Sequence, residues 1–165
     1  MNSEPRVLGP SIRELVFVPA LLTLAVSGVR LALEFGGAPG WLASSNMGGG
    51  AALLGIVWLP AVFGPIFAFR LRPHLAAGKP FRRRLWKTLT IYGLLARAPI
   101  ALITIPAVLG EWGTHYDKFP GITGVATRIG AGFFAQLVFW ACLWTPLLGL
   151  AAASIATRLR PLRGT

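Results

Sequence analysis

Four long apolar runs alternate with short polar segments along the chain, covering about 15–33, 50–69, 88–109 and 125–156. Each run is close to or above the ~20 residues that an α-helix needs to cross ~30 Å of hydrocarbon, at ~1.5 Å per residue. The pattern therefore predicts an all-α integral membrane protein. We expect residues 1–165 to form a single domain, a bundle of four transmembrane helices.

Prolines and small residues occur inside these predicted spans. The prolines are Pro19, Pro60, Pro65, Pro99, Pro106 and Pro146. A proline within a helix removes a backbone N–H and bends the helix. Small residues one turn apart, such as Gly149 and Ala153, let two backbones approach closely in a membrane. We expect proline-kinked helices that pack together.

The distribution of basic residues predicts the orientation. Twelve of the 16 lysines and arginines lie before the first span, between the second and third spans, or after the fourth. Three others, Arg30, Lys118 and Arg128, lie near the two remaining linkers. Because cytoplasmic loops are enriched in basic residues, both termini are predicted to be cytoplasmic.

Composition agrees with a membrane location. The chain is 55% hydrophobic and 13% charged, about half the charged fraction of a soluble domain. A net charge of +11 on a soluble fold would suggest nucleic acid, but these charges flank apolar runs, so no nucleic-acid partner is expected. Short loops, with no targeting segment or glycosylation sequon, indicate the inner or plasma membrane of a prokaryote.

Arg97 is the main candidate for a site residue, because its charged side chain lies near the middle of the third predicted span. An arginine at that depth costs ~2.5 kcal/mol or more unless it faces protein or water. It belongs to a small and polar stripe at helical spacing: Thr90, Gly93, Arg97, Ala101 and Thr104. Gln136 of the fourth span lies at nearly the same depth and is the predicted hydrogen-bond partner of Arg97. Arg97 is either a structural tie between helices or a binding point for an anion, a lipid headgroup or a quinone carbonyl.

The first predicted span carries a matching polar stripe of Thr23, Ser27, Arg30 and Glu34. Arg30 and Glu34 are four residues apart, so their side chains lie on one helical face near the outer boundary. We expect these two side chains to form an ion pair.

The linker between the third and fourth spans contains Glu111, His115 and Asp117, which are all possible metal ligands. Spacing this loose is common by chance, so they are weak candidates and no metal is expected. The alternative is an ordinary interfacial loop with Trp112 and Tyr116 at the headgroup level.

The central linker combines aromatic residues with a basic cluster of Lys79, Arg82, Arg83, Arg84 and Lys87. Such clusters attract anionic lipids at ~1 kcal/mol per base. Membrane lipids are therefore expected partners of this segment.

No catalytic set lies within the predicted spans, which contain no histidine and no paired carboxylates. The leading hypothesis is a non-enzymatic protein without a cofactor, either an accessory subunit of a membrane complex or a self-associating bundle. Its partners would be other membrane subunits or further copies of the chain. The alternative is a small transporter or channel for an anionic or lipid-like solute that uses Arg97. A third hypothesis is an enzyme that acts on a lipid through Glu111, His115 and Asp117.

Overall fold

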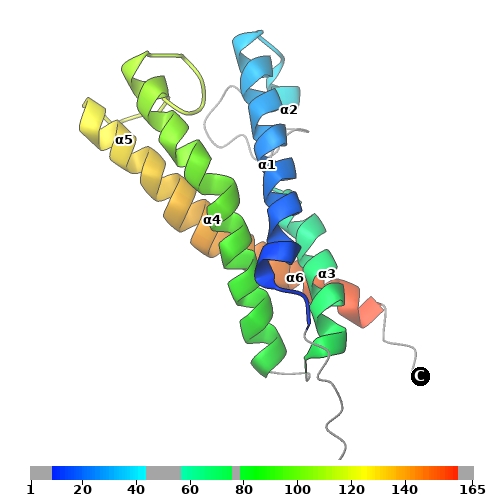
Figure 1. The fold of residues 1–165 in the computed structure, drawn as a ribbon. Helices are drawn as coiled ribbons and strands as arrows, with labels where there is room; N and C mark the ends of the chain where they lie inside the picture. The colour runs from blue at the N-terminus through cyan, green and yellow to red at the C-terminus, as the bar shows by residue number, and fades with distance from the viewer. Residues whose placement is uncertain (1–8, 44–56, 76–78, 160–165) are drawn as a thin grey trace, which may run out of the picture.

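The computed structural model describes residues 9–43, 57–75 and 79–159, which form helices joined by turns (Figure 1). Three helices are long and apolar enough to cross a membrane: Ile12–Phe35, Lys79–Leu109 and Val125–Leu159. The predicted all-helical class is confirmed for the part of the chain that the structure describes, and these three helices are consistent with a membrane protein.

Helix α1 (Ile12–Phe35) begins at a capping box. The Ser11 side chain accepts a hydrogen bond from the backbone of Glu14, and the Glu14 carboxylate accepts one from the backbone of Ser11. Gly36 follows the last turn, and its N–H donates to the carbonyl of Ala32. These caps extend the helix by two or three residues beyond each end of the predicted span.

In the described part of the second predicted span, the helix begins at Leu59. After the short helix α2 (Gly40–Ala43), helix α3 covers Leu59–Leu71 and continues into one turn of 3-10 helix, Arg72–His74. Residues 50–56 lie outside the described residues. Pro60 was expected inside the span, but it occupies the first turn of α3, where a missing N–H removes no helical hydrogen bond.

The third and fourth predicted spans belong to the two longest helices. Helix α4 (Lys79–Leu109) begins nine residues before the predicted span and therefore includes the basic cluster. Helix α5 (Val125–Phe133) continues without a break into a π-helix, η2 (Phe134–Trp144), and then into α6 (Thr145–Leu159). The fourth predicted span thus matches one continuous helix.

The π-helix ends next to Pro146. The backbone N–H and the hydroxyl of Thr145 both donate to the carbonyl of Trp140, five residues earlier. The carbonyl of Ala141 would be next in this pattern, but Pro146 has no N–H to donate. Gly93 of α4 lies against this carbonyl, at a distance of 2.6 Å from a Cβ built on the glycine. A side chain larger than hydrogen would push the two helices apart there.

The α5–η2–α6 helix runs diagonally behind α4, so that α5 lies beside the end of α4 while α6 lies beside α3 (Figure 1). We call the end of the bundle at which α1 and α4 finish and α5 starts the loop end. The opposite end, at which α4 starts and α6 finishes, is the basic end.

The core near the basic end is aromatic and closely packed. The rings of Phe63 and Phe67 of α3 meet the ring of Tyr92 of α4 edge to face, with centroids 5.4 and 5.6 Å apart. The hydroxyl of Tyr92 lies 2.7 Å from that of Thr23 in α1, which satisfies both buried groups. Three helices therefore meet at Tyr92.

Candidate functional site

Arg30, Glu34 and His115 form a buried ion-paired group at the loop end. Arg30 Nε lies 3.3 Å from Glu34 Oε1, as expected for the predicted pair. His115 Nδ1 lies 2.6 Å from the same oxygen and 2.8 Å from Oε2, and the His115 backbone N–H also donates to Oε2 at 3.2 Å. The side chain of Glu34 is only 2% exposed. One carboxylate thus ties the α4–α5 loop to α1.

His115 is held in a setting that favours its neutral form. Burial lowers the pKa of His115 below its usual value, and the hydrogen bond to Glu34 opposes that shift. The positive charges of Arg30 and Arg97 lower the pKa further. The contact with Glu34 places the imidazole proton on Nδ1, because a carboxylate is an acceptor.

Arg97 is buried between α4 and the π-helix. Its Nη1 donates to Gln136 Oε1 at 3.5 Å, so the structure contains the predicted hydrogen bond. Its guanidinium carbon lies 5.5 Å from the ring centre of Trp140, one turn further along the π-helix. The residue is 5% exposed. Both contacts attach Arg97 to the fourth span, and both partners are uncharged.

The two threonines of the predicted stripe do not reach Arg97 with a hydrogen bond. Thr104 is buried, and a Cβ built on Gly132 would overlap its side chain, so Thr104 fills the contact between α4 and α5. Thr90 is half-buried, and its hydroxyl donates to the Trp86 carbonyl of its own helix at 3.1 Å. It lies two turns from Arg97, about 10 Å along the axis, too far for direct contact.

Asp117 organises the turn between α4 and α5. Its carboxylate accepts hydrogen bonds from the backbone N–H groups of Gly113 and Thr114 at 2.9 and 2.7 Å. The Thr114 hydroxyl also donates to it, at 3.0 Å. Arg128 of α5 donates to the Asp117 backbone carbonyl at 2.5 Å. The carboxylate is therefore committed to the loop itself.

The weak metal hypothesis for Glu111, His115 and Asp117 is wrong as a ligand set. These three side chains form no metal-binding group, and none occurs among the described residues. The reason is that each residue has a different role: Asp117 caps its own turn, His115 faces Glu34, and Glu111 occupies a left-handed backbone position with φ of 48°.

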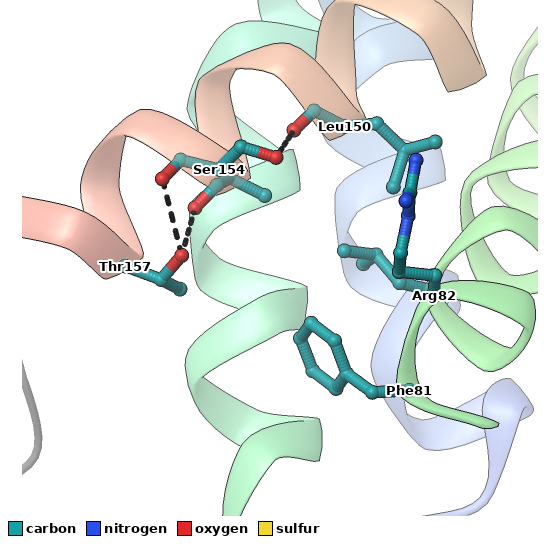
Figure 2. A pocket seen from close by; sticks show the side chains of 7 residues that line it. Phe81, Arg82, Leu150, Ser154 and Thr157 are labelled. Carbon is teal, nitrogen blue, oxygen red and sulfur yellow. Dashed lines mark hydrogen bonds between the residues drawn. The ribbon is translucent and has the colours of Figure 1, made fainter. Parts of the chain in front are cut away.

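The basic cluster forms the first turns of α4, beside a small cavity of about 70 Å³ between α4 and α6 (Figure 2). Its lining residues are Phe81, Arg82, Leu85, Leu150, Ala153, Ser154 and Thr157. Figure 2 shows the hydroxyls of Ser154 and Thr157 turned toward carbonyls of their own helix, each at 2.8 Å. Arg82 is therefore the charged side chain of this cavity, and it is exposed.

Sequence reasoning missed the contact between Glu34 and His115, because 81 residues separate them. The nearness of Glu111 and Asp117 in the sequence directed attention to the wrong partners. A usable signal was present, since the predicted topology places the end of the first span and the third linker on the same side of the membrane.

No family model, curated protein or solved structure matches this chain.

Proposed function

We propose that this chain is a non-enzymatic, four-span membrane protein that acts through helix–helix contacts, as an accessory subunit of a membrane complex or as a self-associating bundle. It would reside in the plasma membrane of a prokaryote with both termini cytoplasmic, as the basic residues favour. Helix α3 would be part of the second crossing, because its 13 apolar-rich residues span about 20 Å. The basic cluster would contact anionic lipids.

The observation that carries this proposal is a contrast among the glycines. A Cβ built on Gly64, Gly93 or Gly132 would collide with a neighbouring helix, so these glycines are used for packing within the bundle. A Cβ built on Gly28 of α1 or Gly130 of α5 meets no described atom within 4 Å. Both glycines lie on exposed helix faces, and their lack of a side chain lets another helix approach closely there.

Further small residues lie one turn away from each of these two glycines on the same helix. On α1, Ala25 and Ala32 are exposed one turn before and after Gly28. On α5, Ala126 is exposed one turn before Gly130. Small residues one turn apart are the common signature of close helix pairs in membranes. The proposal therefore places the partner against α1, α5 or both.

Purification in a mild detergent tests the proposal through mass photometry and identification of co-purifying subunits. Wild type should migrate as an oligomer or with stoichiometric membrane partners. Gly28→Leu and Gly130→Leu should dissociate that assembly, whereas Ala98→Leu, on an exposed position of α4, should leave it intact. A wild-type chain that is a lone monomer in native-like nanodiscs would overturn the proposal.

A second candidate function is transport of a small anionic solute, favoured by the absence of a negatively charged contact at Arg97 among the described residues. Flux of an anion into proteoliposomes measures it directly. Transport that is lost in Arg97→Gln, with the protein still folded, would favour this function over the first. A flux equal to that of empty liposomes would exclude it.

A further inference from the structure

Three buried polar side chains from three parts of the chain lie in the half of the bundle toward the loop end: Arg30 of α1, Arg97 of α4 and Tyr116 of the α4–α5 loop. The two arginines are each 5% exposed, and Tyr116 is 2% exposed. Charged groups this well buried are normally paired with opposite charge, because desolvation of an ion is costly. The partners of these buried side chains therefore indicate whether a charge or a hydrogen-bonding group is missing.

The charges do not balance within the described residues. Arg30 faces the carboxylate of Glu34, which is already shared with His115. Arg97 contacts the amide oxygen of Gln136 and the ring of Trp140, neither of which carries a negative charge. An arginine stays protonated in proteins, so one positive charge remains in excess.

Tyr116 adds a hydrogen-bond donor to the same region. Its ring belongs to a buried cluster with Ile100 and Ala107 of α4, on the helical face that carries Arg97. Its hydroxyl is fully buried and has no hydrogen-bond partner among the described residues. Leaving a buried hydroxyl unbonded is destabilising, so such a group points to a missing partner.

Ile100, which belongs to the same buried cluster as Tyr116, lies one turn beyond Arg97 on α4. Burial raises the pKa of Tyr116 to about 12, while the charges of Arg30 and Arg97 act in the opposite direction and Glu34 raises it. The phenol therefore keeps its proton at neutral pH. It can donate that proton to a ligand but cannot itself neutralise Arg97.

We propose that the loop end of the bundle binds one small monovalent inorganic anion, of the halide class, between the guanidinium of Arg97 and the hydroxyl of Tyr116. The anion balances the charge of Arg97 and accepts the hydrogen bond of Tyr116. The burial of both residues restricts the site to a small ion, since a lipid headgroup or an organic acid would require the helices to separate. This site lies beyond the proposed assembly function and does not depend on it.

Thermal unfolding of the full chain in nanodiscs tests the proposal, with chloride compared against gluconate at constant ionic strength. We expect chloride and bromide to raise the Tm saturably, by about 4–8 °C for a site filled well above its Kd. In gluconate Tyr116→Phe should be at least as stable as wild type, because the hydroxyl that it removes has no hydrogen-bond partner among the described residues, and it should lose most of the halide shift. Tyr92→Phe is the matched control: it loses its contact with Thr23 yet should keep the full halide shift.

A crystal structure of wild type grown in bromide provides a readout that needs no variant to fold. We expect an anomalous peak within hydrogen-bond distance of both Arg97 and Tyr116. Equal Tm values in chloride, bromide and gluconate would overturn the proposal and leave a water as the partner of Tyr116. A halide shift that Tyr116→Phe retains in full, or a bromide peak elsewhere, would overturn it as well.

Discussion

The two ends of the bundle are held together by different chemistry. At the basic end, the aromatic rings of Phe63, Phe67 and Tyr92 interlock. There α3 and α6 approach so closely that a side chain on Gly64 would overlap the backbone of Gly149. Toward the loop end, polar contacts join the elements: the Glu34 carboxylate of α1 holds His115 of the α4–α5 loop, and Arg97 of α4 donates to Gln136 of the π-helix.

This difference follows from the membrane as a solvent. Lipid tails are as apolar as leucine side chains, so apolar helices gain little from the hydrophobic effect when they associate in it. Close fit and dispersion must hold the basic end, which makes it sensitive to side-chain volume. The loop end depends on paired charges in a medium that solvates charge poorly, which makes it sensitive to charge.

The largest expected effect comes from removing one charge at the loop end. Glu34→Gln preserves the shape of the side chain but leaves Arg30 without its carboxylate. Removing one partner of a buried ion pair costs about 3–5 kcal/mol. Reversible unfolding in mixed micelles should therefore show a loss of this size in the free energy of unfolding.

The double variant Arg30→Leu with Glu34→Leu separates charge from packing. Replacing both members of a buried pair by apolar residues is often neutral or stabilising. Glu34 also accepts hydrogen bonds from the backbone and ring of His115, so the double variant should recover only part of what Glu34→Gln loses. If Glu34→Gln is as stable as wild type, the loop end does not depend on charge. If the double variant is the less stable of the two, the lost hydrogen bonds to His115 outweigh the uncompensated charge of Arg30.

A smaller effect is expected from added volume at the basic end. Gly64→Ala introduces a Cβ that would overlap the backbone of Gly149, and a backbone cannot turn aside as a side chain can. Overpacking of this kind costs about 1–3 kcal/mol. Gly28→Ala, on an exposed face of α1, is the matched control and should be as stable as wild type or slightly more so. Equal stability of the two variants in micelles would contradict a basic end held by close fit.

The periodicity of the sequence was sufficient to predict that the chain is helical and which side chains pair within or between its helices. Arg30 and Glu34 are four residues apart on one helix, so their pairing follows from helical geometry. Arg97 and Gln136 were paired by counting depth in two spans, which works because both helices cross the same slab. Predictions of this kind need only the residue spacing of a single helix or the depth of each residue along its predicted span.

Contacts made by loops and by irregular helix geometry could not be predicted in this way. His115 reaches Glu34 only because Asp117 shapes the turn that carries it. The π-helix before Pro146 packs against α4 at Gly93, and the hydrophobic pattern predicted neither the π-helix nor this contact. The start of α3 at Leu59 also departs from hydropathy, since the apolar run continues past that point in both directions.

The smallest expected effect is a pH dependence confined to the loop end. Because the pKa of His115 is lowered in the folded protein, the unfolded chain takes up its proton first as the pH falls below about 6.5. Stability is therefore complete above that pH and decreases below it, with a slope of at most about 1.4 kcal/mol per pH unit for one proton. Unfolding of wild type at pH 8 and at pH 5.5 measures this loss.

Two histidine variants decide whether His115 is the group responsible. His115→Asn retains a donor for Glu34 but cannot titrate, so its stability should change less between pH 8 and 5.5 than that of wild type. His74→Asn, at an exposed position near the basic end, should keep the full wild-type dependence. Arg30, Glu34, Arg97 and Tyr116 surround His115 in both proteins, so their contribution cancels in the comparison. If His115→Asn keeps the wild-type slope, His115 is not the source of the acid sensitivity.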